Sequence, residues 1–133
     1  MKSALFGNGL SFSAGYDQDG RLTSLVAAPS GGGGVQDLSF GYDLASNIAS
    51  ITDAVSPSRS QTFQYDSVNR LTQATGVYGT KTWSYDLVGN RTQQTSNAGT
   101  TSYAIASSSN RVTSVAGAGG TRVMSYAFRA IGE

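Results

Sequence analysis

The stretch Tyr65-Asp66-Ser67-Val68-Asn69-Arg70-Leu71-Thr72 contains the features that decide the fold. An aromatic residue and an aspartate lead into Asn69, a residue type that tolerates a positive φ in a tight turn. The pair Phe63-Gln64 comes just before it, and a spacing of two places Phe63 and Tyr65 on one face of a strand. The segment therefore predicts a strand, a tight turn and a second strand.

The same pattern recurs along the chain. It reads Tyr-Asp-Gln-Asp-Gly-Arg-Leu-Thr at 16–23, Tyr-Asp-Leu-Ala-Ser-Asn-Ile at 42–48 and Tyr-Asp-Leu-Val-Gly-Asn-Arg-Thr at 85–92. A degenerate copy begins at Tyr103-Ala104-Ile105, and a sixth begins at Tyr126. We therefore expect a single repeat array over residues 1–133, with units starting near residues 16, 42, 65, 85, 103 and 126.

The spacing of the repeats favours β-hairpins over helices. Successive tyrosines follow at steps of 26, 23, 20, 18 and 23 residues, and exposed hairpin loops tolerate such changes of length. No window carries apolar residues at helical spacing over three turns. The predicted fold is all-β, with antiparallel β-hairpin repeats forming a curved, solenoid-like sheet.

Each residue type of the repeat has an expected structural role. The aspartate accepts hydrogen bonds from backbone N–H groups of the turn, and the arginine beyond the turn pairs with it or lies over the tyrosine ring. Asp66 and Arg70 are four residues apart, whereas Gly89-Asn90 makes the fourth unit one residue longer. In the fifth unit Ala104 stands in place of the aspartate, so this turn should be the weakest. The repeat residues are Tyr16, Asp17, Gly20, Arg21, Tyr42, Asp43, Asn47, Tyr65, Asp66, Asn69, Arg70, Tyr85, Asp86, Gly89, Asn90, Arg91, Tyr103, Asn110, Arg111 and Tyr126.

Composition argues against several classes of function. The chain has no Cys and no His, which removes thiolate chemistry, zinc-thiolate sites and the commonest general base. Nine basic and eight acidic residues give a net charge of +1 without a block of like charge, so we expect no nucleic-acid partner. We expect no enzyme, no catalytic residue, no metal and no cofactor.

The start of the chain and its hydropathy bear on location. The sequence has no apolar run long enough to span a membrane, which needs about 18 residues. The N-terminal residues lack the apolar region of a signal peptide. If the protein is exported, we expect the signal to belong to a larger parent protein.

The segment Asp17-Gln18-Asp19-Gly20 looks like the opening of a calcium-binding loop. Such a loop needs a bidentate glutamate at its twelfth position. Counted from Asp17, that position is Ala28, whose side chain offers no oxygen. A turn is the better interpretation.

The large aromatic residues before the turns form a ladder that has two interpretations. Trp83 and Tyr85, like Phe63 and Tyr65, are spaced to share one face of the sheet. If exposed, this ladder would be a carbohydrate-binding stripe; if buried, it would be the core. Leu, Ile, Val and Phe together number only 26 of 133 residues. With so few aliphatic residues to bury, the interpretation of the aromatic ladder as the core is favoured.

The repeated motifs resemble those of the RHS/YD-repeat family. Its consensus is close to Tyr-Asp-x-x-Gly/Asn-Arg-Leu-Thr, which the segments at 16–23, 65–72 and 85–92 match. The lead-in at 6–10, Phe-Gly-Asn-Gly-Leu, is similar to a stretch that precedes the repeats in this family. The resemblance extends from about residue 6 to the end of the sequence.

The resemblance implies a fold and a setting. Family members wind their hairpins into a spiralling sheet that forms a hollow shell, and they include bacterial polymorphic toxins, wall-associated proteins, toxin-complex shell components and teneurins. In the toxins the shell encloses a variable C-terminal toxic domain. This chain is too short to close a shell, and it lacks the Asp-Pro-x-Gly segment with self-cleaving aspartates that follows the repeats.

Together these observations predict a structural repeat segment, a partial RHS shell, that belongs to a larger secreted or surface protein and scaffolds or encapsulates a toxic domain. Its partners would be neighbouring repeats or the parent protein. The alternative is a module that binds carbohydrate or a cell surface through its aromatic ladder.

Overall fold

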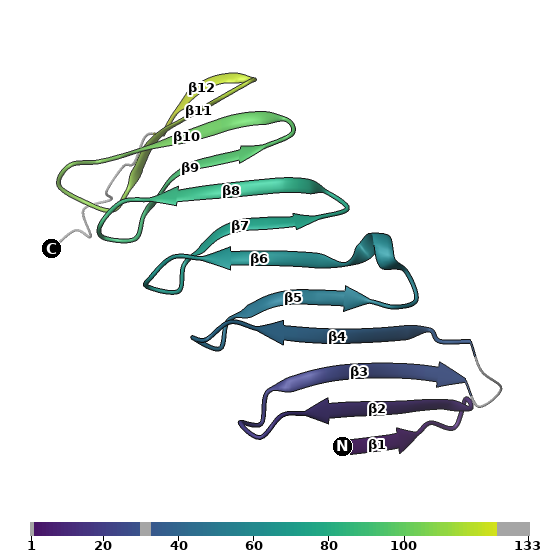
Figure 1. The fold of residues 1–133 in the computed structure, drawn as a ribbon. Coiled ribbons are helices and arrows are strands. Elements are labelled where there is room, and N and C mark those ends of the chain that lie inside the picture. Colours follow the sequence, from purple (N-terminus) through teal and green to yellow (C-terminus); the bar gives the residue numbers. More distant parts are fainter. Residues whose placement is uncertain (1, 30–32, 125–133) are drawn as a thin grey trace, which may run out of the picture. The chain divides into compact units, whose positions relative to one another are not determined.

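The computed structural model describes residues 2–29 and 33–124, and in these ranges the chain is almost entirely β-strand (Figure 1). The strands are β1 (Lys2–Leu5), β2 (Leu10–Tyr16), β3 (Leu22–Pro29), β4 (Gln36–Tyr42), β5 (Ile48–Asp53), β6 (Gln61–Tyr65), β7 (Leu71–Gly76), β8 (Gly79–Tyr85), β9 (Arg91–Ser96), β10 (Gly99–Ile105), β11 (Val112–Gly117) and β12 (Gly120–Val123). A single 3₁₀ turn, η1 (Pro57–Arg59), lies between β5 and β6. Tyr126, the expected start of a sixth unit, lies outside the described residues.

The strands form a simple meander. Their order in the 12-stranded sheet is their order in the chain, and strands are antiparallel to their neighbours. This confirms an all-β fold of antiparallel hairpins, while the curvature of the sheet stays a prediction. The chain divides into two compact units, residues 1–80 and 81–133. Within the described ranges, no helix is both long and apolar enough to cross a membrane.

The two faces of the sheet differ in side-chain size. On β6, Phe63 and Tyr65 are half-buried, whereas Thr62 and Gln64 point to the other face and are exposed. In the second unit Trp83 on β8 is likewise half-buried and Ser84 is exposed. Alternation along β6 and β8 therefore separates an aromatic face from a face of small hydroxyl and amide side chains.

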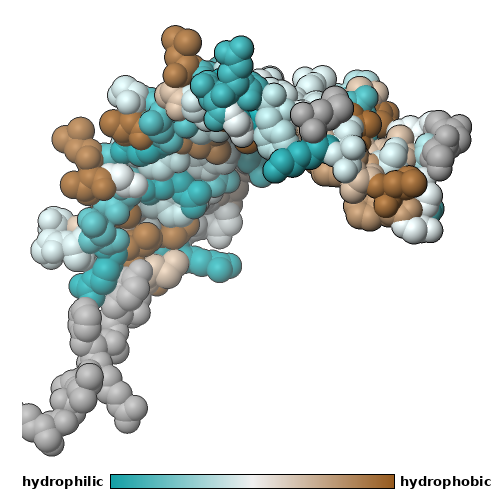
Figure 2. Space-filling view, turned by 90° about the horizontal axis from the view of Figure 1, so that it is seen from below, coloured by the Kyte–Doolittle hydropathy of each residue, from teal (hydrophilic) through white to brown (hydrophobic). Residues whose placement is uncertain are grey.

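The molecule has very little closed core. Among the described residues only Ala14, 3% exposed, and Ala74, 4% exposed, are buried hydrophobic residues. Ala74 lies opposite Phe63 in the pairing of β6 with β7, so the two side chains are neighbours on one face of the sheet. Hydrophobic side chains remain visible at the surface in Figure 2. Because burial is so limited, hydrogen bonds of the turns must contribute much of the local order.

A β-bulge follows each of the five tight turns that carry the repeat motif. In the first hairpin Tyr16 pairs with Leu22 and Gly15 pairs with Ser24, so the ladder passes over Thr23. The residue passed over in the five hairpins is Thr23, Ala49, Thr72, Thr92 and Thr113. The threonine of the repeat motif thus marks a bulge, which increases the local twist of the strand.

Gly20 provides a test of the turn geometry. It has φ +78° with no heavy atom within 4 Å of an added Cβ, so Gly20→Ala should cost only backbone strain. We expect the free energy of unfolding to fall by about 1–2 kcal/mol, measured by urea denaturation. Gly7→Ala is the matched control, because Gly7 also has open space but no positive φ. Equal losses in the two variants would contradict the turn geometry.

Candidate functional site

The turn at Asp66 is closed by a single carboxylate. Its Oδ1 accepts the backbone N–H groups of Val68 at 3.0 Å and Arg70 at 2.9 Å, and its Oδ2 accepts the guanidinium Nε of Arg70 at 2.6 Å. The Asp66 N–H donates to the Arg70 carbonyl at 2.9 Å, and the Asn69 N–H donates to the Asp66 carbonyl at 3.0 Å. Side chain and backbone therefore close the same short loop.

The turns at Asp17, Asp43 and Asp86 repeat this arrangement. In the first, Arg21 Nε donates to Asp17 Oδ2 at 2.7 Å. In the other two an asparagine replaces the arginine: the amides of Asn47 and Asn90 donate to the aspartate Oδ2 at 3.0 and 2.8 Å. Because the residue four positions after the aspartate bonds to it through its own N–H, arginine and asparagine are interchangeable here.

The prediction that the fourth turn is one residue longer than the others is wrong. The Asp86 N–H donates to the Asn90 carbonyl, the same four-residue closure as in the other three turns. Asn90 occupies the position of the arginine, and Arg91 is already the first residue of β9. The sequence Gly89-Asn90-Arg91 therefore contains a substitution and no insertion.

In these four turns the residue three positions after the aspartate has a left-handed backbone conformation. Gly20 has φ +78° and Gly89 has φ +97°, and the non-glycine residues Ser46 and Asn69 have φ +67° and +63°. Sequence reasoning found three of the four positions and missed Ser46, since serine is less typical of this backbone region.

The fifth turn lies two residues later than the alignment on Tyr103 predicts. β10 continues to Ile105, which pairs with Val112 across the bulge, as Tyr65 pairs with Leu71 in the third hairpin. The closing bond runs from the Ala106 N–H to the Arg111 carbonyl at 2.9 Å. The aspartate position is thus held by Ala106 and the tyrosine position by Ile105, and Ala104 is corrected to a strand residue. The side chain of Arg111 donates to Ser109 Oγ at 3.2 Å.

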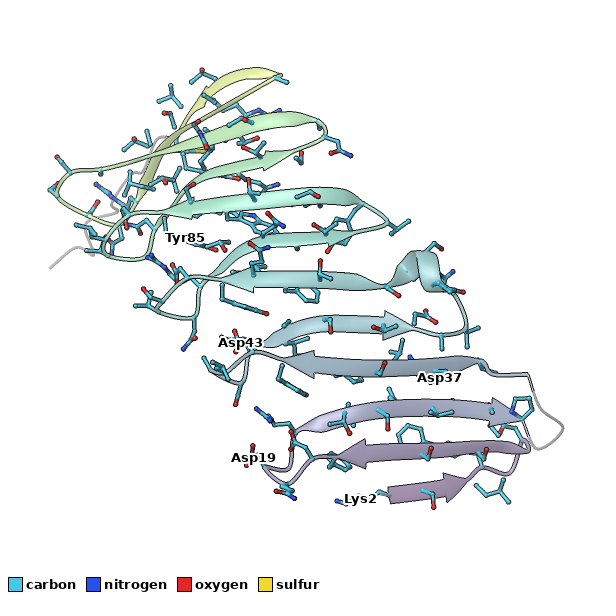
Figure 3. The ribbon with its side chains drawn as sticks, in the orientation of Figure 1. Lys2, Asp19, Asp37, Asp43 and Tyr85 are labelled. Carbon is cyan, nitrogen blue, oxygen red and sulfur yellow. The ribbon has the colours of Figure 1, made fainter. Side chains whose placement is uncertain are left out.

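Within each unit, consecutive turns are bonded to one another. In the first unit the turns lie at the same ends of the strands, as the labels of Asp19 and Asp43 in Figure 3 show. The Arg21 guanidinium lies 4.9 Å over the ring of Tyr42, the tyrosine of the next repeat. Arg21 Nη1 donates to Ser46 Oγ at 2.8 Å. In the other direction, the Tyr42 hydroxyl donates to the Leu22 carbonyl at 2.8 Å. The expected arginine–tyrosine contact therefore joins two repeats.

The second and third turns are joined in the same way. Asn47 Nδ2 donates to Asn69 Oδ1 at 2.8 Å, and the Tyr65 hydroxyl donates to the Ile48 carbonyl at 3.0 Å. Burial raises the pKa of Tyr65, and the nearby carboxylate of Asp43 raises it further. This hydroxyl therefore stays protonated and keeps its role as a donor at neutral pH.

In the second unit the cross-turn contacts change with the shifted register. Asn90 Nδ2 donates to Asn110 Oδ1 at 3.2 Å, which matches the asparagine contact of the first unit. Arg91 lies 4.8 Å over the ring of Tyr103 and donates from Nη2 to its hydroxyl at 3.2 Å. Since Ile105 has no hydroxyl, this arginine–tyrosine pair joins the two repeats instead.

The turn carboxylates are held ionised. The bond from the Arg21 guanidinium lowers the pKa of Asp17, and the amides of Asn47 and Asn90 lower the pKa values of Asp43 and Asp86. For Asp66 the main cause of the lowered pKa is the backbone N–H of Arg70. A carboxylate that is already occupied as an acceptor and has a lowered pKa is a weak general base.

The segment from Asp17 to Gly20 forms a turn. The Asp17 carboxylate accepts bonds from Asp19 N–H and from Arg21, and the Asp19 carboxylate lies 3.3 Å from Arg21 Nη2. These bonds are the ones that the turn interpretation requires.

The aromatic ladder is intermediate between the two interpretations. Phe63 and Tyr65 in the first unit and Trp83 and Tyr85 in the second are all half-buried. Trp83 Nε1 donates to Gln94 Oε1 on β9 at 3.2 Å, which holds the indole ring in place.

Comparisons with known proteins identify similar structures. No protein-family model and no curated protein matches the sequence. Among solved structures, the Photorhabdus luminescens Tc holotoxin pore matches with a TM-score of 0.72 and 26% identity over 83% of this chain. The crystal structures of TcdB2-TccC3 and of TcdB2-TccC3-Cdc42 match with TM-scores of 0.71 and 0.70, each at 26% identity over 83% of this chain.

The structural neighbours are thus components of Tc toxin complexes. This chain spans only 7% of each of those chains. The similarity, over 83% of this chain, supports a repeat-scaffold fold.

The cross-turn tyrosine bond can be tested with Tyr42→Phe. Losing the 2.8 Å bond to the Leu22 carbonyl should lower the free energy of unfolding by about 1 kcal/mol, measured by urea denaturation. Tyr16→Phe is the control, because Tyr16 is 45% exposed and makes no hydroxyl hydrogen bond to a described residue. An equal loss at Tyr16 would mean that the effect does not arise from the cross-turn bond.

The capped turns predict acid sensitivity. Folding lowers the pKa of four aspartates from 3.8, so the unfolded chain binds more protons than the folded chain in that range. The Tm of thermal unfolding should be constant above about pH 5 and should fall as the pH drops below about 4. Changing all four aspartates to asparagine should flatten this fall. Parallel pH profiles for the two proteins would refute the assignment.

Proposed function

We propose that this chain is a segment of a larger RHS-type protein, secreted or surface-exposed, in which the repeats scaffold or enclose an associated toxic domain. The observation that carries the proposal is the bonding between consecutive turns. Within each unit, hairpins form hydrogen bonds to their neighbours, as Arg21 does to Ser46 and Tyr42 to the Leu22 carbonyl. Such a unit gains stability from stacking, as in other repeat proteins.

The state of the polar groups supports a structural role. The carboxylates of the capped turns accept backbone and side-chain donors, and the tyrosine hydroxyls donate to backbone carbonyls. These groups hold the array together and have no evident substrate to act on. We therefore propose no catalytic step for this segment.

The comparisons support the setting. The similar structures belong to Tc toxin complexes, and this chain corresponds to a small part of each. The Tyr-Asp motifs resemble the RHS repeats, which supports the same family on independent grounds. A larger parent protein would supply the remaining repeats, the export signal and the enclosed domain.

The proposal is tested in the source cells. Antibodies raised against this segment should detect a product much larger than 13.7 kDa in the culture fluid or at the cell surface. Limited proteolysis of that product should leave a C-terminal fragment protected until the repeats are denatured by acid or urea. Detection of only a free 13.7 kDa protein would refute the segment assignment, and immediate digestion of everything C-terminal to the repeats would refute enclosure.

A further inference from the structure

The two units carry opposite net charge. Residues 1–80 contain four basic and six acidic residues, a net charge of −2. The described part of the second unit, residues 81–124, contains four basic residues and one acidic residue, Asp86, a net charge of +3. The Asp86 carboxylate is occupied by its own turn. The cations of the second unit therefore have no other described carboxylate in that unit to neutralise them.

Most of these cations lie with aromatic residues on one face of the sheet. Lys81 and Trp83 share a face of β8 because they are two residues apart, and Trp83 pairs with Gln94. Gln94 pairs with Thr101, which is two residues from Tyr103 on β10. Tyr103 pairs with Val115, and Val115 with Arg122, so the same face continues to β12.

Arg91 adds a further cation to this face. Its guanidinium stacks 4.8 Å over the ring of Tyr103 and bonds to the Tyr103 hydroxyl at 3.2 Å. Neither Arg91 nor Arg122 forms an ion pair with a described residue, and both are exposed. We call this surface the basic face, defined by Lys81, Trp83, Arg91, Gln94, Tyr103 and Arg122.

We propose that the basic face binds an acidic polysaccharide. Arg91 and Arg122 would pair with its carboxylates, the neutral side chain of Gln94 would bond to hydroxyls, and the indole of Trp83 would pack against a sugar C–H face. Five strands at about 4.8 Å spacing span about 19 Å, enough for several sugar units. The binding is tested on the isolated chain, so its outcome is independent of the test of the parent protein.

The arrangement fits a polysaccharide better than a nucleic acid. Single-stranded nucleic acids are bound by aromatic rings on which successive bases stack. Here Arg91 covers the ring of Tyr103, so this ring is not open for a base to stack on. The remaining surface is hydrogen-bonding and cationic, which matches a chain of hydroxyls and carboxylates.

The test uses the purified 133-residue chain with polygalacturonate as the probe, measured by isothermal titration calorimetry. We expect saturable binding at low ionic strength that weakens at high salt, because exposed charges are screened. Neutral dextran of similar size should bind at least several-fold more weakly. Absence of polygalacturonate binding, equal binding of dextran, or tighter binding of a thymidine oligonucleotide would overturn the proposal.

Variants locate the site. Arg91→Gln and Arg122→Gln should each weaken polygalacturonate binding about three- to fivefold, the effect of losing one exposed ion pair. Arg59→Gln is the matched control, because it removes the same charge from an exposed arginine on η1 in the first unit. Circular dichroism confirms that each variant is folded. A loss at Arg59 equal to that at Arg91 would show non-specific attraction and refute the site.

Discussion

The hydrogen bonds accepted by one aspartate carboxylate at each tight turn are the interaction on which the structure depends. At Asp66 the carboxylate binds two backbone N–H groups and one guanidinium group, so a single side chain sets both the turn and the side chain that follows it. A sheet with only two buried hydrophobic residues in its described ranges cannot rely on a core to hold its hairpins. Local closure of the turn replaces part of what burial supplies in a thicker domain.

The capped turns also explain why the repeats vary in length. The aspartate turns close over four residues in the first four hairpins. The connections at the opposite ends of the strands differ in length. They are residues 30–35 between β3 and β4, 54–60 between β5 and β6, 77–78 between β7 and β8, and 97–98 between β9 and β10. The change in period is therefore absorbed in these connections, while the first four aspartate turns keep the same closure.

The capped turns and the proposed basic face overlap at one pair of residues, because Arg91 and Tyr103 both join two repeats and belong to that face. The capped turns join neighbouring repeats within each unit. The basic face lies across the strands of the second unit, where the aspartates that balance charge elsewhere are scarce.

Local chemistry made the strands and turns predictable from the sequence. Alternation such as Phe63-Gln64-Tyr65 and the aspartate before Asn69 act within a few residues, so the hairpins, their direction and the capping role of the aspartates followed directly. Sequence alone did not determine the register of the fifth turn, where Tyr103 is two residues from the tyrosine position, because register depends on pairing between strands. The partners of Arg21 and Arg91, the bulge at the threonines and the basic face also required the tertiary structure. Each of them joins residues of separate strands or repeats, and such contacts are fixed by the packing of one hairpin on the next.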